Sequence, residues 1–179
     1  MPKKPTSGDM AFVRKAKRGD ESAFRELVSR YQGKLCLYLR HLTLAGDECE
    51  DILQEVFVKA YNALSRFDAR KRFSPWIYRI AHNEAVNYLK KKNRRKLVSW
   101  EDIASSKDEL GAVGESETPE EEWMRKDIQN GVQQALARLP EKDRELILFR
   151  YFLEKPYAEI SEILGVPENT VASRLYRAK

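Results

Sequence analysis

The sequence predicts an all-α protein made of two small helical domains, joined by a flexible acidic linker, with a helix-turn-helix in the C-terminal domain. Three observations predict this fold. Apolar residues recur every three or four positions along most of the chain, which is the period of an amphipathic helix. No segment alternates in the manner of a strand, and charge changes abruptly twice. A chain of 179 residues is long enough for two small domains, each with its own core.

Charge and composition place the domain boundaries. Residues 1–96 carry 22 Lys and Arg against 11 Asp and Glu, whereas residues 97–124 carry 1 against 9. Helical periodicity also fails between Ser99 and Glu122, where Ser, Gly, Asp and Glu dominate, as is typical of linkers. We therefore expect an N-terminal domain over residues 1–96, a linker over 97–122 and a C-terminal domain over 123–179.

The N-terminal domain is predicted to hold three main helices, preceded by a shorter one over about residues 11–18. The first follows Asp20, a good N-cap residue, and continues for about six turns to Leu42. The second follows Gly46, and its predicted buried side consists of Leu53, Phe57, Ala60, Tyr61 and Leu64. The third begins at Ser74 and Pro75, and its buried side consists of Ile77, Ile80, Ala81, Ala85, Tyr88 and Leu89.

The C-terminal segment reads as two short helices joined by a turn, after a helix over about residues 142–153. Pro156 and Pro167 each open a helix, and Gly165 ends the first of the pair. The second helix leaves one polar face free, typical of a recognition helix in a DNA major groove. That face and its flank hold Asn169, Thr170, Ser173, Arg174, Tyr176 and Arg177. The alternative is that both helices simply close a helical core.

One face of the helix after Gly46 is polar, with Asp51, Gln54, Glu55 and Asn62 on it. Carboxylates beside an amide and the nearby apolar Val58 would suit a basic helical partner. A merely solvated face would have the same composition, so the pattern alone leaves both interpretations open.

Basic and aromatic residues interleave around the third helix, which favours contact with nucleic acid. One stripe of this helix consists of Trp76, Arg79, Asn83, Asn87, Lys90 and Arg94. The preceding loop adds a flexible basic rim of Arg70, Lys71, Arg72 and Phe73, which could hold an unstacked base. The alternative is a solvated basic helix with Trp76 packed beneath the loop.

The sequence gives no indication of an active site. It has no phosphate-binding Gly loop, no nucleophile beside a base and no metal-ligand spacing, so we expect no enzyme, cofactor or metal. Cys36 and Cys49 are expected to be buried free thiols, and His41 and His82 ordinary helix residues. No apolar run is long enough for a signal peptide or membrane span, which indicates a cytoplasmic protein without membrane insertion.

Three segments, in this order, resemble the extracytoplasmic-function (ECF) sigma factors of bacterial RNA polymerase, over about residues 23–179. DILQEVFVKAY resembles the family's polymerase-clamp-binding helix, FSPWIYRIAHNEAVNYLKKKNRR its minus-10 segment and LPEKDRELILFRYFLEKPYAEISEILGVPENTVASRLYRAK its minus-35 domain. Three motifs in register are far more specific than one helix-turn-helix.

The resemblance implies a transcription initiation factor that binds core RNA polymerase and promoter DNA, in a stress or envelope response, under the control of an anti-sigma factor. It implies that Asp51, Gln54, Glu55 and Phe57 dock on the coiled coil of the largest polymerase subunit. Asn83 and the loop from Arg66 to Phe73 would capture a flipped minus-10 base. The resemblance assigns the minus-35 contacts to Ser173, Arg174 and Arg177, and places the acidic linker near the active channel.

Some positions depart from the family's pattern. Housekeeping sigma factors carry paired tryptophans at the melting edge, whereas here Trp76 is followed by Ile77, as is usual in the ECF group, which implies weaker melting and stricter promoter choice. Ala172 stands where many members have Lys or Arg, so one DNA contact is expected to be missing. The chain stops at Lys179, inside a helix that members usually extend. The competing functions are a repressor or activator that works without polymerase, a helical adaptor and an RNA-binding regulator.

Overall fold

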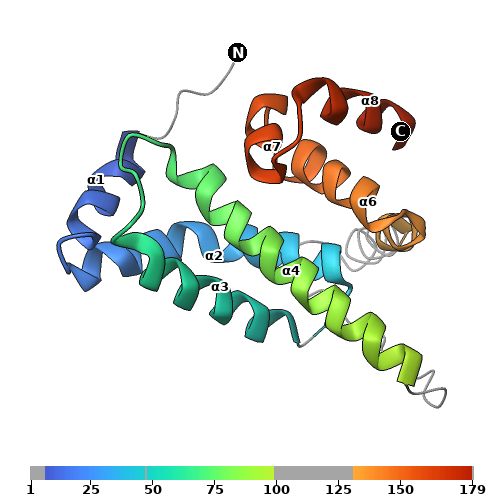
Figure 1. The fold of residues 1–179 in the computed structure, drawn as a ribbon, viewed down its shortest axis with the longest axis horizontal. Helices are drawn as coiled ribbons and strands as arrows, with labels where there is room; N and C mark the ends of the chain where they lie inside the picture. Colours follow the sequence, from blue (N-terminus) through green and yellow to red (C-terminus); the bar gives the residue numbers. More distant parts are fainter. Residues whose placement is uncertain (1–6, 47, 99–130, 179) are drawn as a thin grey trace, which may run out of the picture.

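The computed structural model describes residues 7–46, 48–98 and 131–178, and within these ranges all regular structure is helical (Figure 1). The prediction of an all-α fold with a C-terminal helix-turn-helix is confirmed. Helices α1 to α4 form one module, called the N-terminal module below. Residues 131–178 form the second, called the C-terminal module. The predicted linker, residues 97–122, lies outside the described residues except that α4 extends to Val98.

The first two helices are α1 (Ser7–Ala16) and α2 (Glu21–Thr43). Asp20 caps α2 as expected, since its carboxylate accepts a hydrogen bond of 3.1 Å from the backbone N–H of Ala23. Helix α1 begins earlier than predicted, and Asp9 within it accepts a hydrogen bond of 2.7 Å from the Tyr31 hydroxyl. A buried acceptor with a partner on α2 thus fixes α1 against the module.

The buried side of α3 (Glu48–Leu64) differs from the prediction by about one position. The buried residues are Cys49, Ile52, Val56, Ala60 and Leu64, whereas Leu53 and Phe57 are half-buried and Tyr61 is 47% exposed. The predicted stripe followed the larger side chains. The observed stripe has smaller side chains because α3 packs between α2 and α4, where close approach leaves less room.

Helix α4 (Phe73–Val98) crosses the N-terminal module along its whole length (Figure 1). It begins just before the predicted Ser74–Pro75 start, and Ile77, Ala81, Ala85 and Leu89 are buried as expected. Tyr78 was not predicted to be in the core, yet it is fully buried. Its ring is covered by residues of the C-terminal module, which a helical period within α4 cannot reveal.

The helix predicted over residues 142–153 is in fact two elements. Helix α6 (Glu141–Ile147) continues into η1 (Leu148–Phe152), a π-helical turn in which the Leu153 N–H donates to the Leu148 carbonyl at 3.0 Å. Glu154 then adopts a left-handed φ of 50°, so the chain reverses toward the next helix. This wider turn places Phe149 fully inside the core.

The helix-turn-helix consists of α7 (Tyr157–Leu164) and α8 (Glu168–Ala178). Gly165 ends α7 with a φ of 67°, the left-handed conformation that glycine adopts without a steric penalty, and its N–H donates to the Ser161 carbonyl. Pro156 and Pro167 each lie directly before a helix, which confirms their predicted role. Ile160 and Ile163 of α7 pack with Val171 and Leu175 of α8.

The two modules pack against each other and share one apolar core. Helix α7 lies beside the first half of α4, and η1 lies against α2 (Figure 1). Phe149 stacks on Tyr38 with 4.8 Å between ring centroids and meets the edge of Tyr78 at 5.8 Å. Among the described residues, no helix is long and apolar enough to cross a membrane.

Candidate protein and nucleic-acid interfaces

The polar face of α3 is open to solvent. Asp51, Gln54 and Glu55 are exposed, and Val58, one turn further on, is 55% exposed. On another side of the helix, the Lys59 ammonium lies 2.6 Å from the Glu84 carboxylate of α4 and ties α3 to its neighbour. The acidic face is therefore held on a rigid helix and is available to a partner.

Phe57 does not lie on this open face. Its side chain is half-buried and packs against the core beside α3's buried stripe. A half-buried ring can still offer one edge to a partner, but its main contact is within the N-terminal module. The contact of Phe57 with polymerase stays a prediction.

The α4 stripe predicted to contact nucleic acid is exposed over its C-terminal half. Asn83, Asn87, Lys90 and Arg94 all face solvent on one side of the helix. Amides can hydrogen-bond base edges, and cations can neutralise phosphates, so the row combines both kinds of contact.

The loop before α4 is held by specific contacts, although it was expected to be flexible. The Lys17 ammonium donates to the Phe67 carbonyl at 2.5 Å. Asp68 accepts hydrogen bonds from the Arg70 side chain at 3.0 Å and from the Arg70 N–H at 3.0 Å. The Arg70 side chain, followed by its N–H, lowers the pKa of the Asp68 carboxyl to about 2. Lys71 is exposed at the tip of this turn.

The aromatic residues of this region form a cluster under the loop, which corrects the expectation for Phe73. Its side chain is only 3% exposed and meets the edges of Tyr31 and Phe67. Trp76 is half-buried and lies 4.8 Å from Phe67 between ring centroids. Packing beneath the loop was the alternative interpretation of Trp76, and in this conformation both rings support the loop, so Phe73 is not available to stack on a base.

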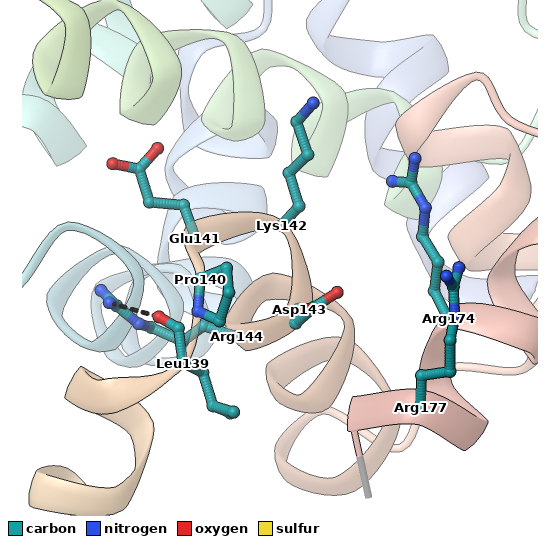
Figure 2. A pocket seen from close by; sticks show the side chains of 8 residues that line it. All are labelled: Leu139, Pro140, Glu141, Lys142, Asp143, Arg144, Arg174 and Arg177. Carbon is teal, nitrogen blue, oxygen red and sulfur yellow. Dashed lines mark hydrogen bonds between the residues drawn. The ribbon is translucent and has the colours of Figure 1, made fainter.

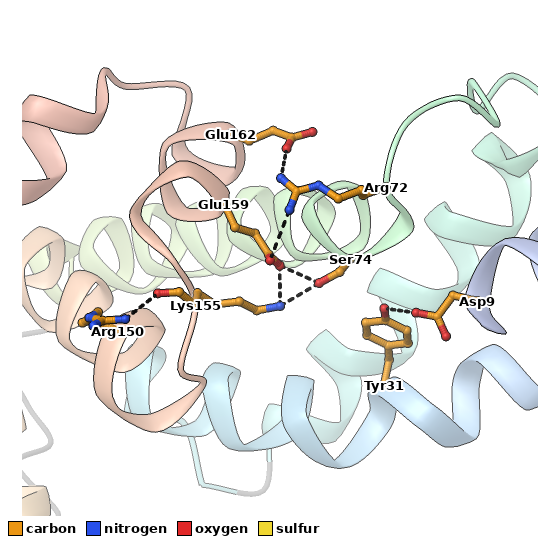
Figure 3. A network of polar contacts seen from close by, with 8 residues as sticks. All are labelled: Asp9, Tyr31, Arg72, Ser74, Arg150, Lys155, Glu159 and Glu162. Atoms are coloured by element: carbon orange, nitrogen blue, oxygen red, sulfur yellow. Dashed lines mark hydrogen bonds and ion pairs between the residues drawn. The ribbon is translucent and has the colours of Figure 1, made fainter. Parts of the chain in front are cut away.

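Two cations of the predicted nucleic-acid surface, Arg79 and Arg72, contact α7, and Figure 3 shows the contacts of Arg72. The Arg79 guanidinium donates to the Glu162 carbonyl at 2.5 Å and to the Ile163 carbonyl at 3.3 Å. The Arg72 guanidinium lies 2.7 Å from the Glu162 carboxylate and 3.8 Å from that of Glu159. The sequence could not reveal these pairs, because their partners lie more than eighty positions away and only the packing of the modules brings them together.

A buried polar cluster lies beneath these pairs (Figure 3). The Lys155 ammonium donates to the Glu159 carboxylate at 2.5 Å and to the Ser74 hydroxyl at 2.6 Å, and lies 4.3 Å from the Tyr78 ring centroid. Burial lowers the pKa of Lys155, and the attraction of Glu159 opposes that shift only in part. Ser74 was expected to cap α4, but its side chain bonds across the module boundary instead.

The exposed face of α8 has the composition predicted for a recognition helix. Asn169, Ser173 and Arg177 are exposed, and the Tyr176 ring is 86% exposed. Figure 2 shows Arg174 and Arg177 facing Asp143 of α6 across an open pocket of about 680 Å³. Thr170 is half-buried, and its carbonyl accepts a hydrogen bond from the Ser173 hydroxyl. The face is thus presented by a helix braced on its opposite side.

Two further residue sets were missed by sequence reasoning. Glu145 is buried, accepts a hydrogen bond from Tyr38 and lies 2.6 Å from Nδ1 of His82. Arg144 is buried and donates to the Leu42 carbonyl at 2.9 Å and to three carbonyls of its own module. In the sequence, Arg144 and Glu145 are only two charged residues among apolar ones in a helical pattern. Such residues usually lie on the exposed surface of a helix, so the pattern did not indicate that these two are buried.

Cys36 and Cys49 are free thiols, as expected, and Cys49 is buried whereas Cys36 is half-buried. The structure brings their sulfur atoms within 3.8 Å, which their separation in sequence did not indicate. Within the described ranges, no three His, Cys, Asp or Glu side chains converge as metal ligands.

Comparison with known proteins gives consistent matches. Residues 27–95 match the family model described as Sigma-70 region 2, and residues 129–179 match that described as Sigma-70, region 4. The ECF RNA polymerase sigma-E factor of Haemophilus influenzae is 37% identical over 175 residues, which cover 96% of this chain and 91% of the relative. The ECF RNA polymerase sigma factor SigW of Bacillus subtilis is 31% identical over 93% of this chain and 90% of its own length.

Solved structures share the fold. CnrH, in complex with the cytosolic domain of CnrY, matches with a TM-score of 0.69 and 23% identity over 95% of this chain and 91% of that one. RpoE from Bartonella quintana, crystallised with the anti-sigma factor NepR, matches with a TM-score of 0.66 and 23% identity over 87% of this chain and 91% of that one.

Proposed function

Because the chain belongs to the ECF sigma factors of the sigma-70 family, we propose that its three exposed surfaces divide the work of transcription initiation between polymerase, the minus-10 element and the minus-35 element. It is a non-enzymatic initiation factor that binds core RNA polymerase and directs it to specific promoters. The observation that carries the division is that the three surfaces lie on three different helices and differ in charge and composition.

The acidic α3 face is the polymerase-docking surface. Asp51, Gln54 and Glu55 offer two charges and an amide on successive turns, and Val58 adds an apolar contact at the same face. Such a face suits a basic helical partner, as the coiled coil of the largest polymerase subunit would be. Phe57 supports this surface from within the module.

The α4 surface reads the minus-10 element. Asn83 and Asn87 are positioned for base edges, while Lys90 and Arg94 further along the helix neutralise phosphates. Arg70, Lys71, Arg72 and Arg79 extend the cationic surface toward the loop, where a flipped base would be held beside the half-buried Trp76. The exposed row and the ordered loop support this assignment.

The α8 face reads the minus-35 element in the major groove. Ser173, Arg174 and Arg177 are the principal contacts, and Asn169, Thr170 and Tyr176 lie on or beside the same face. Each good contact between a side chain and a base pair contributes roughly 1–3 kcal/mol of discrimination. Polymerase would set the spacing of both DNA-reading surfaces, so that their weak affinities combine through effective concentration.

An anti-sigma protein is the proposed regulator, and the cytoplasm is the proposed location. RpoE, which shares this fold, is described in complex with the anti-sigma factor NepR. CnrH, which also shares it, is described in complex with the cytosolic domain of CnrY. The boundary between the two modules is the surface on which a protein could hold them in one arrangement.

In vitro transcription with core polymerase on a genomic fragment library tests the proposal. The wild-type chain should produce specific run-off transcripts, whose start sites report the promoter sequence. The double variant Asp51→Lys/Glu55→Lys should lose most transcription and co-elution with polymerase, because it reverses two charges on an exposed docking face. Glu21→Lys, a charge reversal on an exposed residue of α2, is the matched control and should retain both activities.

Two results would contradict the proposal. Tight binding of the isolated chain to a palindromic duplex, unaffected by polymerase, would indicate an independent repressor or activator. Retained association of the double variant with polymerase would remove the docking assignment for α3.

A further inference from the structure

The two thiols of the chain meet between α2 and α3, and neither belongs to the surfaces assigned above. Cys36 lies in the second half of α2, and Cys49 lies in the first turn of α3. Their sulfur atoms are 3.8 Å apart, and the Cys49 thiol also donates to the Cys36 carbonyl at 3.4 Å. A disulfide bond is about 2.0 Å long, so the sulfur atoms would have to approach by roughly 1.8 Å. A sulfur atom moves by such a distance when its side chain changes rotamer.

The two thiols differ in their access to solvent. Cys36 is half-buried, whereas Cys49 is fully buried. Burial, followed by the neighbouring Cys36, raises the pKa of the Cys49 thiol to about 12, so Cys49 keeps its proton at neutral pH. An oxidant that arrives from solution therefore reacts first with Cys36.

Arg40, one turn after Cys36 on α2, places a positive charge beside the pair. Its attraction acts against burial and favours the thiolate form of Cys49. The Nε atom of Arg40 is buried and has no hydrogen-bond partner in the described part of the chain. A buried N–H donor without an acceptor is unfavourable, and a thiolate beside it would supply one. Arg40 is thus suited to stabilise the negative charge that develops on sulfur during attack.

Adjacent thiols are also found in metal sites. A structural zinc site needs four ligands, most often Cys and His. Within residues 7–46, 48–98 and 131–178, no three His, Cys, Asp or Glu side chains converge. The pair therefore fits a disulfide better than a metal site.

We propose that Cys36 and Cys49 are a redox-active pair: a hydroperoxide oxidises Cys36, and Cys49 then closes a reversible disulfide that fixes the first turn of α3 to α2. The inference goes beyond the proposed function and does not depend on it. In a reducing compartment the pair would rest as two thiols, and the bond would form only when an oxidant is present.

Atoms and electrons balance over two steps. The Cys36 thiolate attacks one oxygen of hydrogen peroxide and breaks the O–O bond, which gives a sulfenic acid on Cys36 and a hydroxide that takes up the thiol proton as water. The Cys49 sulfur then attacks the Cys36 sulfur and breaks its S–O bond. The hydroxyl group leaves as water with the Cys49 proton. The two thiols together lose two electrons, and these reduce the peroxide to water.

The disulfide would act on the helix that bears the acidic face. Helix α3 begins at Glu48, and Cys49 precedes Asp51 by two positions. The first turn of a helix opens easily, because its N–H groups have no partner within the helix. A covalent link to α2, a helix of 23 residues, would restrict this opening. Oxidation would therefore hold Asp51 more rigidly against the rest of the N-terminal module.

The test is treatment of the purified full chain with hydrogen peroxide, followed by mass spectrometry. The intact chain should lose about 2 Da, the mass of two hydrogen atoms, and dithiothreitol should restore it. Trypsin cleaves after Lys34, Arg40 and Lys59, so the two cysteines fall in separate peptides, residues 35–40 and 41–59. Before reduction, these two peptides should be recovered as one disulfide-linked species.

Two matched variants establish the order of the steps. Cys49→Ser keeps a donor for the Cys36 carbonyl, and it should stop at the sulfenic acid, which dimedone traps on Cys36. Cys36→Ser should give at least about tenfold less dimedone adduct, because Cys49 is enclosed. Circular dichroism checks that both variants keep the helix content of wild type. The peptide map of the wild-type chain tests the disulfide without any variant.

Hydrogen exchange then compares the reduced and oxidised wild-type chains at residues 48–56, with residues 157–164 of α7 as an internal control. Exchange at residues 48–56 should slow on the order of tenfold in the oxidised chain and should stay unchanged in α7.

Three results would overturn the proposal. The first is covalent dimers in place of the linked peptides. The second is oxidation of the wild-type chain that ends at sulfenic or sulfinic acid on Cys36. Unchanged exchange at residues 48–56 in the oxidised chain is the third, since it would show that the bond does not fix the first turn of α3.

Discussion

The Tyr38 hydroxyl donates a hydrogen bond of 2.5 Å to the Glu145 carboxylate, although the two residues are 107 positions apart in the sequence. His82 of α4 contacts the same carboxylate oxygen, so Glu145 links the C-terminal module to α2 and α4 together. Its side chain is 8% exposed, which makes the partners important, since a buried carboxylate without hydrogen bonds is strongly disfavoured.

Replacing Tyr38 with Phe should lower the free energy of unfolding by about 1–3 kcal/mol, since it leaves a buried carboxylate with one partner fewer. Urea unfolding of Tyr38→Phe, Glu145→Gln and the double variant measures this. The two effects should not add, because Tyr38→Phe removes this bond and Glu145→Gln weakens the same bond by removing the charge of its acceptor. Additive effects would mean that the hydrogen bond does not contribute to stability.

Alkaline pH should unfold the protein through its buried tyrosines. Burial, followed by Asp9, raises the pKa of Tyr31, burial and then Glu145 raise that of Tyr38, and burial and then Glu159 raise that of Tyr78. Above the ordinary tyrosine pKa of about 10, the unfolded chain releases these protons while the folded chain retains them. Stability is thus present below about pH 10 and is lost as pH rises further.

Ultraviolet titration should therefore show some of the 8 tyrosines ionising only together with unfolding. Tyr176, which is 86% exposed, is the internal control, and Tyr176→Phe should remove intensity only from the early phase. A single early transition for all tyrosines, with retained helix content, would contradict the prediction.

Gly165→Ala should destabilise the chain by about 1–2 kcal/mol, because an L-residue is strained at a φ of 67°. An added Cβ would meet only the Arg79 guanidinium at 3.7 Å, an ordinary contact, so the loss comes from the backbone. Gly33→Ala is the matched control. Gly33 lies within α2 with open space around it, and alanine there should add about 0.5–1 kcal/mol of stability. Thermal unfolding of both variants decides whether the signs differ.

Cys36 and Cys49 should react with iodoacetamide at very different rates. Burial, followed by the neighbouring Cys36, raises the pKa of the Cys49 thiol to about 12. At about pH 8 little thiolate is present, so alkylation of Cys49 should be at least about a hundredfold slower than that of Cys36. Peptide mapping by mass spectrometry measures both rates, and urea should equalise them. Similar rates in the folded chain would show that Cys49 is not enclosed.

Arg177→Ala should weaken polymerase-dependent binding to promoters with an intact minus-35 element by about 1–3 kcal/mol. Arg177 is exposed on the α8 face, so its loss should leave the fold unchanged. Binding to a promoter with a scrambled minus-35 element is the comparison. An equal loss on both templates would mean that Arg177 contacts phosphate only.

Local features of the fold could be predicted from the sequence. Asp20 caps α2, and Gly165 ends α7, because each depends on a few neighbouring backbone groups. The predicted buried stripe on α3 is wrong, and Tyr61 is exposed, because the buried side follows the close packing of the neighbouring helices and not the size of the side chains. The π-helical turn at residues 148–152 has no sequence signal that distinguishes it from an ordinary helix.

The exposure of the predicted surface residues followed from the sequence where it depends on one helix, whereas their contacts with polymerase and DNA stay predictions. The exposed residues of α3, the far half of α4 and α8 follow directly from helical period. The contacts of Arg72 and Arg79 could not be predicted, since they depend on how the two modules meet, and the burial of Phe73 could not, since it depends on packing against Tyr31 of α2. A periodic pattern within one helix carries no information about which distant helix packs against it.

The position of Phe149 has a consequence for the chain once its modules part. Three aromatic rings, those of Phe149, Tyr38 and Tyr78, would then face water at the same time. An exposed apolar patch of this kind promotes aggregation, so chains whose two modules have separated would tend to aggregate unless another protein covers the rings. The concentration of the opened form would therefore have to stay low, or RNA polymerase would have to cover the three rings.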